Sequence, residues 1–238
     1  MILKSEHKLL NNRKQQTIPF STVLASTVHD MKNALSLILL SLADITDKLK
    51  EVDPDDSKVS VLRYETSRVN GLLVQLLALY KSEQQQLPLN INYHNVYDFL
   101  EEQVLSYDEL LTSKNITVNI EVEEELDWAF DSDLMAMVIS NIITNNIRYT
   151  DSSIALKASI KDDMLDIAIS DDGTGYPVLM ITNQKDVILG INQSTGSTGL
   201  GLYFAGQVAS MHSNDNKTGN ICLSNCENSG GIFTIRIP

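Results

Sequence analysis

Three polar residues that could act together in chemistry, His29, Asp30 and Asn33, interrupt the apolar stretch ASTVHDMKNALSLILL (residues 25–40). A neutral imidazole nitrogen is a nucleophile if the other ring nitrogen keeps its proton and donates it to an acceptor. A neighbouring carboxylate can be that acceptor, and on a helix Asn33 lies one turn beyond His29 on the same face. The residues equally fit a solvent-exposed pair on an amphipathic helix, so they indicate phosphotransfer only if the chain also binds a phosphoryl donor.

A second polar group, in NIITNNIRYT (residues 141–150), could hold a metal-bound phosphate. Asn141 and Asn145 are four residues apart on one helix face, and Arg148 lies three residues further on. Mg²⁺ keeps most of its waters and needs few protein ligands, so two amide oxygens and a cation can hold a hydrated Mg²⁺ and a triphosphate. Asn pairs on helices are also common without any ligand.

A third segment, ISDDGTGYP, places Asp171, Gly173 and Gly175 at the end of a predicted strand. An aspartate there can accept a hydrogen bond from an exocyclic amine, and the glycines let the backbone turn beneath a flat ring. A plain β-turn fits the same residues.

A fourth segment, GSTGLGLYFAGQVA, leads from glycines 196, 199 and 201 into an apolar helix. Free amides at a helix N-terminus bind phosphate, and glycines allow its close approach. No lysine follows the glycines as in a Walker loop, and the spacing of a Rossmann turn is absent.

The heptad spacing of apolar residues predicts a long helix that carries His29. The stripe is sustained over more than three heptads, which is typical of a coiled coil or four-helix bundle. Pro54 ends it, and a second apolar stripe continues to Tyr80 before Pro88. Because two helices alone cannot bury both stripes, we predict a homodimer in which two hairpins form a four-helix bundle. The first stripe consists of Leu24, Val28, Met31, Leu35, Ile38, Leu42, Ile45 and Leu49.

Beyond Pro88, short β-like segments alternate with apolar helices, which predicts an α/β sandwich with one sheet covered by helices on one face. The predicted helices span residues 96–112, 133–149 and 200–211. We therefore expect a multidomain α plus α/β chain with a lead-in (1–19), a helical hairpin that dimerises (20–87) and an α/β domain (88–238).

The formal charge of -13, from 18 basic and 31 acidic residues, disfavours nucleic acid as a partner. No apolar run approaches the roughly 20 residues of a membrane span, so we expect a cytoplasmic protein. Cys222 and Cys226 lack the further ligands of a usual metal site and are expected to be reduced thiols.

In combination, these motifs resemble those of bacterial two-component sensor histidine kinases, from about Phe20 to Pro238. HDMKN is similar to the H-box, NIITNNIRYT to the N-box, DDGTG to the G1 box, STGLGL to the G2 box, and GGIFTIRIP to the last strand of the catalytic domain. Any one of these boxes is weak evidence, but five in the correct order are specific.

The resemblance implies a dimeric phosphotransfer bundle followed by an ATP-binding domain of the GHKL (Bergerat) type. His29 would accept the phosphoryl group, and Asp30 would orient and activate His29. Asn33 would align a water for dephosphorylating the partner response regulator. Asn141 and Asn145 would bind Mg²⁺, and Asp171 would bind the adenine amine. The nucleotide-binding residues implied by the resemblance are Asn141, Asn145, Arg148, Tyr149, Asp171, Gly173, Gly175, Thr198, Gly199, Leu200 and Gly201.

The implied partners are the receiver domain of a response regulator, a second copy of the chain, and a separate sensor protein, since only about twenty residues precede the first helix. Two departures concern activity: Ala34 replaces a proline common after the H-box, and Arg148 replaces a lysine. Two alternatives stay open. One is a phosphotransfer or scaffold protein with a degenerate ATP domain, and the other is a GHKL serine kinase or ATPase, which would leave His29 unexplained.

Overall fold

The computed structural model describes residues 20–49, 57–182, 184, 199–214, 216–226 and 230–238. The chain forms two compact units, Met1–Leu73 and Val74–Pro238. Their boundary falls within the second long helix, and the domain division expected at residues 87 and 88 stays a prediction. The expected lead-in and the turn at Pro54 lie outside the described residues.

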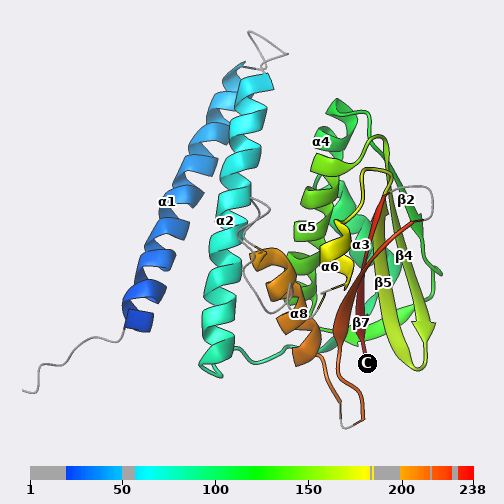
Figure 1. Ribbon diagram of the computed structural model, residues 1–238. Coiled ribbons are helices and arrows are strands. Elements are labelled where there is room, and N and C mark those ends of the chain that lie inside the picture. Colours follow the sequence, from blue (N-terminus) through cyan, green and yellow to red (C-terminus); the bar gives the residue numbers. More distant parts are fainter. Residues whose placement is uncertain (1–19, 50–56, 183, 185–198, 215, 227–229) are drawn as a thin grey trace, which may run out of the picture. The chain divides into compact units, whose positions relative to one another are not determined.

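Two long helices, α1 (Phe20–Leu49) and α2 (Ser57–Glu83), follow the two predicted apolar stripes. In the first unit α1 and the beginning of α2 run in opposite directions (Figure 1). Val28 and Leu42 of the α1 stripe are buried, whereas Met31, Ile38 and Ile45 are exposed. The chain therefore leaves part of this stripe uncovered, and the predicted dimeric four-helix bundle stays a prediction.

The second unit contains a five-stranded sheet in the order β2-β4-β5-β7-β6 and a separate two-stranded ribbon, β1-β3. Strands β2 and β4 are parallel, and the other neighbours are antiparallel. The helices are α3 (Val96–Leu105), α4 (Asp108–Ser113), α5 (Ser132–Tyr149), α6 (Val178–Thr182) and α8 (Leu200–Met211). The strands are β1 (Asn92–Asn95), β2 (Thr117–Glu121), β3 (Asp127–Phe130), β4 (Ser153–Lys161), β5 (Met164–Asp171), β6 (Asn220–Asn225) and β7 (Gly231–Ile237).

The main sheet is covered by α3, α5 and α8 on one face (Figure 1). Alternate residues of β5 and β7, such as Ile167 and Ile235, are fully buried on that face, as the period of a strand requires. The predicted α/β sandwich is therefore confirmed for this unit. The expected helix over residues 96–112 is wrong in one respect: it ends at Leu105, and α4 is a separate short helix.

The long helix α5 is fixed at its beginning by Asp131. The Asp131 carboxylate accepts hydrogen bonds from the backbone N–H of Leu134 at 3.0 Å and of Asn90 at 2.8 Å. Its own N–H donates to Nε2 of buried His212, whose Nδ1 donates to the carbonyl of Val208 at 2.8 Å. An N-cap of this kind contributes about 1 kcal/mol, and here it also ties the start of α5 to the end of α8.

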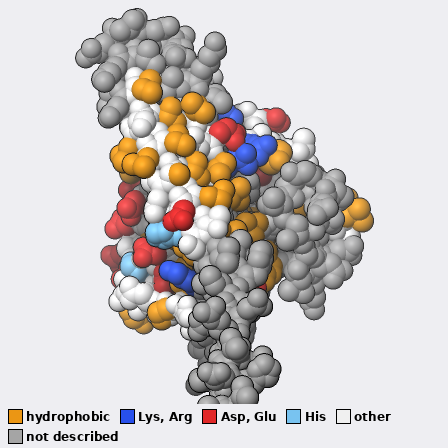
Figure 2. All heavy atoms as spheres, turned by 90° about the vertical axis from the view of Figure 1, so that its left-hand side faces the viewer, with side chains coloured by type: hydrophobic (Ala, Val, Ile, Leu, Met, Phe, Trp, Pro, Cys, Tyr) orange, Lys and Arg blue, Asp and Glu red, His pale blue; other side chains and the backbone are white. Residues whose placement is uncertain are grey.

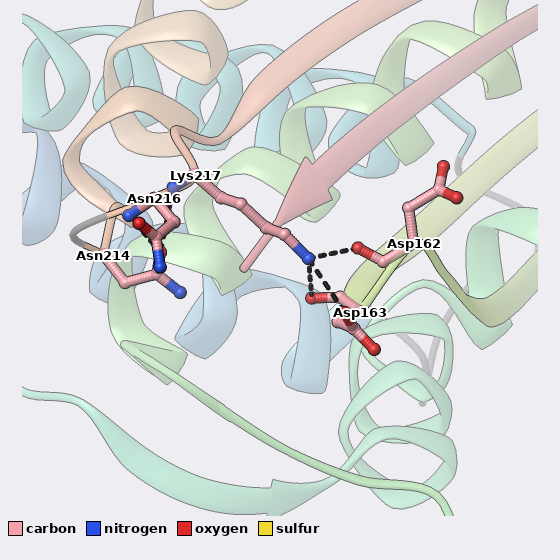
Figure 3. Close-up of polar contacts among 5 residues, drawn as sticks. All are labelled: Asp162, Asp163, Asn214, Asn216 and Lys217. Carbon is pink, nitrogen blue, oxygen red and sulfur yellow. Dashed lines mark hydrogen bonds and ion pairs between the residues drawn. The ribbon is translucent and has the colours of Figure 1, made fainter.

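Two side-chain contacts fix the periphery of the sheet. Asp162 and Asp163, which form the β4–β5 turn, both have φ of 53°, and Nζ of Lys217 binds the carbonyl of Asp162 and the Asp163 carboxylate (Figure 3). On edge strand β6, the amide of Gln184 donates to the carbonyl of Leu223 at 2.7 Å and accepts from its N–H at 3.0 Å. These contacts hold two surface segments against the sheet.

Candidate functional site

The candidate nucleophile, His29, lies on α1 with 61% of its side chain exposed. Its Nδ1 is 3.3 Å from the amide nitrogen of Asn33 and 3.7 Å from the carboxylate of Asp30. Both partners therefore meet the same ring nitrogen, and Nε2 takes no part in either contact. The amide nitrogen of Asn33 can only donate, so it bonds Nδ1 when the proton is on Nε2. In the other tautomer, Nδ1–H faces the Asp30 carboxylate and the lone pair of Nε2 is available for attack.

The two asparagines predicted to face a nucleotide lie on α5. Asn141 is half-buried and its Nδ2 has no hydrogen-bond partner, whereas Asn145, one turn later, is exposed. An amide atom left without a partner inside a protein calls for an explanation, and a ligand that binds there supplies one.

The start of α8 packs against Asn141. Gly199 is the N-cap of α8, with φ of 63°. A Cβ added to Gly201 would lie 2.2 Å from Nδ2 of Asn141, so any larger residue here would displace the Asn141 amide from its present position. The N-terminal amides of α8 therefore lie beside Asn141, as a phosphate site requires.

The turn after β5 packs against the other end of α5. The Asp171 carboxylate accepts from the N–H of Gly173 at 2.9 Å. A Cβ at Gly173 would lie 1.9 Å from the carbonyl oxygen of Tyr149, the last residue of α5. Gly175 has φ of 73°, a conformation that favours glycine.

Asp172 anchors this turn to the segment that follows α5. Its carboxylate accepts from the hydroxyls of Thr150, Ser152 and Ser153 and from three backbone N–H groups, of residues 151–153. Desolvation raises the pKa of Asp172, but hydrogen bonds from Ser152, Thr150 and Ser153 outweigh it and hold the pKa well below its usual range. The carboxylate therefore stays ionised and keeps the turn in place at neutral pH.

Asn225 of β6 holds the same turn from the other side. Its amide oxygen accepts from the N–H of Tyr176 at 2.8 Å, and its amide nitrogen donates to the carbonyl of Tyr176 at 2.9 Å. Burial and the charge of Asp171 raise the pKa of the Tyr176 phenol, so the phenol is neutral at physiological pH.

At the end of α5, two exposed side chains could contact a ligand. The guanidinium of Arg148 lies 5.5 Å from the ring centre of Tyr149. A cation and an aromatic ring next to the Asp171 turn are chemically suited to phosphates and to a base.

The structure thus brings three predicted motifs together on α5: Gly201 meets Asn141, and Gly173 meets Tyr149. Thr198 lies outside the described residues. His29, Asp30 and Asn33 adjoin one another in the other unit. Sequence reasoning missed Asp172, Asn225 and the buried Asn146; for Asn146 a signal existed, since it follows the phase of the buried α5 residues.

The residues at this site fit Mg²⁺ held by amide oxygens. Among the residues that the structure describes, no three His, Cys, Asp or Glu side chains are grouped so as to hold a metal ion. The amide oxygens of Asn141 and Asn145 are the available ligands, and carbonyl oxygens with water suit this hard cation. The unpartnered Nδ2 of Asn141 is a donor and suits a phosphate oxygen instead. Cys222 and Cys226 are free thiols. None of the helices in the described ranges has the length and apolar character needed to cross a membrane.

Comparisons with known proteins agree with this geometry. Residues 130–238 match the family model "Histidine kinase-, DNA gyrase B-, and HSP90-like ATPase". Sensor histidine kinase RcsC of Escherichia coli (strain K12) is 26% identical over 225 residues, which cover 92% of this chain and 23% of RcsC. The chain thus spans about a quarter of the length of this curated relative.

Two solved structures share the fold. Histidine kinase AdeS of Acinetobacter baumannii matches with a TM-score of 0.59 and 21% identity, covering 86% of this chain and 95% of that one. Full-length ShkA in complex with AMPPNP matches with a TM-score of 0.65 and 17% identity, covering 91% of this chain and 45% of that one. The resemblance predicted from the motifs is thereby confirmed: the chain is similar to two-component sensor histidine kinases, and its residues 130–238 match their ATPase family.

Proposed function

We propose that the chain is an ATP-dependent protein histidine kinase that phosphorylates His29 and passes the phosphoryl group to an aspartate of a response-regulator receiver domain. The observation that carries the proposal is the meeting of three motifs on α5, where Gly201 contacts Asn141 and Gly173 contacts Tyr149. The ShkA structure, which shares this fold, is a complex with AMPPNP, and this supports nucleotide binding by the chain.

In this proposal ATP supplies the phosphoryl group, and Mg²⁺ neutralises charge on its phosphates. Asn141 and Asn145 hold the metal, Arg148 and Tyr149 contact the phosphates and nucleotide, and Asp171 accepts from the adenine amine. The amides at the start of α8, from Thr198 through Gly199, Leu200 and Gly201, face the phosphates. Such positioning and charge neutralisation are most of what phosphoryl transfer requires of a protein.

At His29, the neutral ring attacks phosphorus through Nε2 while Nδ1 keeps its proton. As the nitrogen–phosphorus bond forms, the bond between the γ-phosphorus and the bridging oxygen of ATP breaks and ADP leaves. The imidazole gains a positive charge, and the adjacent Asp30, 3.7 Å from Nδ1, stabilises that charge or takes up the Nδ1 proton. Asn33, whose amide nitrogen lies 3.3 Å from Nδ1, is our candidate for aligning a water when the regulator is dephosphorylated.

Dimerisation is proposed from the uncovered apolar side chains of the helical unit. Met31, Ile38 and Ile45 recur every seven residues on α1, and Leu62 and Val69 do so on α2; all five are exposed. Figure 2 shows hydrophobic side chains gathered on the exposed surface of the long helices. A second copy of the hairpin would bury this stripe and complete a four-helix bundle.

The two macromolecular partners are also proposals. Leu37 and Leu40 are exposed on α1, on the side of the helix that carries His29 and Asn33, and can contact a docked receiver domain. The input reaches the kinase through a sensor protein or sensor domain outside this sequence. We keep the 20–87 and 88–238 division for the phosphotransfer and catalytic functions.

The test is labelling of the purified protein with Mg²⁺ and γ-labelled ATP, followed by acid and alkali washes. A kinase of this type gives a label that survives alkali, is lost in acid and is absent from His29→Gln, which still binds ATP. Glu102→Gln is the control, because Glu102 is exposed on α3, outside the residues of the proposed sites and of the dimer stripe, and should label normally. Label that persists in His29→Gln contradicts the assignment, acid-stable label indicates a serine kinase, and no ATP binding indicates the phosphotransfer scaffold.

A further inference from the structure

Asn146 on α5 is a buried polar side chain that the proposed mechanism does not use. It is only 5% exposed, and its Nδ2 has no hydrogen-bond partner. Its backbone carbonyl accepts from the N–H of Thr150 at 2.8 Å, so the unsatisfied group is the side-chain amide alone. A buried amide donor without an acceptor destabilises a folded protein, and such groups are uncommon in native structures.

The position of Asn146 places it in the layer between α5 and the sheet. It follows Ile142 and Ile143 by one turn on the buried side of α5, which packs on β5. On β5, Ile167 and Ile169 are buried on the helix-covered face, and Asp171 continues their alternation. Two polar groups, an amide donor and a carboxylate, therefore enter an otherwise apolar layer from its two sides.

The two groups lie at the same end of that layer. Tyr149, three residues after Asn146, touches Gly173, two residues after Asp171. Thr150 is joined to Asp172 by a hydrogen bond from its hydroxyl. The last turn of α5 is thus held against the turn that begins with Asp171, and Asn146 lies in that last turn.

A carboxylate acceptor and an amide donor at the same end of this layer match the polar groups on one edge of adenine. Adenine presents its N6 amine as a donor next to a ring nitrogen acceptor, N1 on one edge and N7 on the other. Guanine presents the O6 acceptor at the corresponding place, which would face the carboxylate. We propose that Asn146 donates a hydrogen bond to a purine ring nitrogen and, with Asp171, makes the site specific for adenine; this rests on the proposed function.

The first part of the test compares Asn146→Ala with the unmodified chain by calorimetric titration with ATP, 1-deaza-ATP and 7-deaza-ATP. In the unmodified chain, the analogue that lacks the contacted nitrogen binds about fivefold more weakly than ATP, the size of one net hydrogen bond. In Asn146→Ala, ATP binding falls by a similar factor and the difference between ATP and that analogue disappears. Asn70→Ala is the matched control, since Asn70 also has an unpartnered amide atom but lies on α2 in the helical unit.

The second part measures the melting temperature without nucleotide. Asn146→Ala should melt higher than the unmodified chain, because alanine removes an unsatisfied buried amide and favours a helix. A higher melting temperature combined with weaker nucleotide binding is a result that a merely structural asparagine would not give. If Asn146→Ala binds ATP normally, or if both deaza analogues bind the unmodified chain like ATP, the inference is overturned while the nucleotide site stands. If the unmodified chain binds no nucleotide, the proposed function itself fails.

Discussion

Substituting Gly173 by alanine tests the close packing of the Asp171 turn against α5. The new Cβ would lie 1.9 Å from the carbonyl oxygen of Tyr149 and 2.7 Å from its carbonyl carbon. These are backbone atoms and cannot rotate away, so the turn or the helix end must move by more than an ångström. Overpacking costs about 1–3 kcal/mol, and the immobile neighbour places Gly173→Ala near the upper end, about 3 kcal/mol.

The expected results are a melting temperature lowered by about 6–12 °C in calorimetry and ATP binding weakened at least about tenfold in titration. The matched control is Gly71→Ala, because a Cβ at Gly71 meets nothing within 4 Å. Gly71 lies inside α2, where alanine should stabilise by about 0.5–1 kcal/mol. If Gly173→Ala melts within about 1 °C of the unmodified chain and binds ATP equally well, the packing argument for the site is refuted.

Three further outcomes are expected. Gly201→Ala should leave the melting temperature nearly unchanged, because the flexible amide of Asn141 can move aside. Titration should show weakened Mg-ATP binding, because the displaced amide is a proposed ligand. A variant whose free energies of unfolding and of Mg-ATP binding fall by the same amount would contradict this. Asp172→Asn should lower the free energy of unfolding in urea by about 1.5–3 kcal/mol at pH 7. That difference should shrink as the pH falls below about 4, because the native carboxylate has a lowered pKa and its stabilisation is lost once the unfolded state takes up a proton first; a pH-independent difference would contradict the role of the charge. For His212, desolvation lowers the native pKa below 6.5, so its contribution is fully present above that pH and is lost as the pH falls below it. Lowering the pH from 7.5 to 5 should therefore reduce the free energy of unfolding in urea more for the unmodified chain than for His212→Gln. Parallel plots of this free energy against pH would contradict the role of His212.

Long periodic elements were predictable because their signal is local. The heptad stripe predicts α1, and the helix expected over residues 200–211 coincides with α8. The helix expected over residues 96–112 is interrupted although no glycine or proline marks a stop. Tyr107 leaves the helical conformation and its hydroxyl is hydrogen-bonded to Ser140 of α5, a contact 33 residues away that no local pattern reveals.

The short strands show the same limit. Strand β1 is only four residues long and pairs with β3, and its residues NYHN carry no alternation of apolar and polar types. Strand β6, NICLSN, alternates weakly and is fixed by pairing with β7. Strands of this length depend on their partners more than on their own composition.

Within the candidate site, the glycines and asparagines of the motifs could be singled out from type and spacing. Asp172 could not, because its six donors come from residues 150–153, two strands away in sequence. Asn225 holds Tyr176 across 49 residues. Such supporting contacts arise only when the chain has folded, so a single sequence shows the residues that would meet a ligand before it shows those that hold them.

The hydrogen bonds from the amide of Gln184 to edge strand β6 bear on whether the sheet can aggregate with other molecules. An edge strand offers unpaired N–H and carbonyl groups to any other extended chain, and this is a common start of aggregation. At Leu223 both groups are already bonded to Gln184, in the way that a neighbouring strand would bond them. The sheet is thereby closed at this point to strand addition from another molecule.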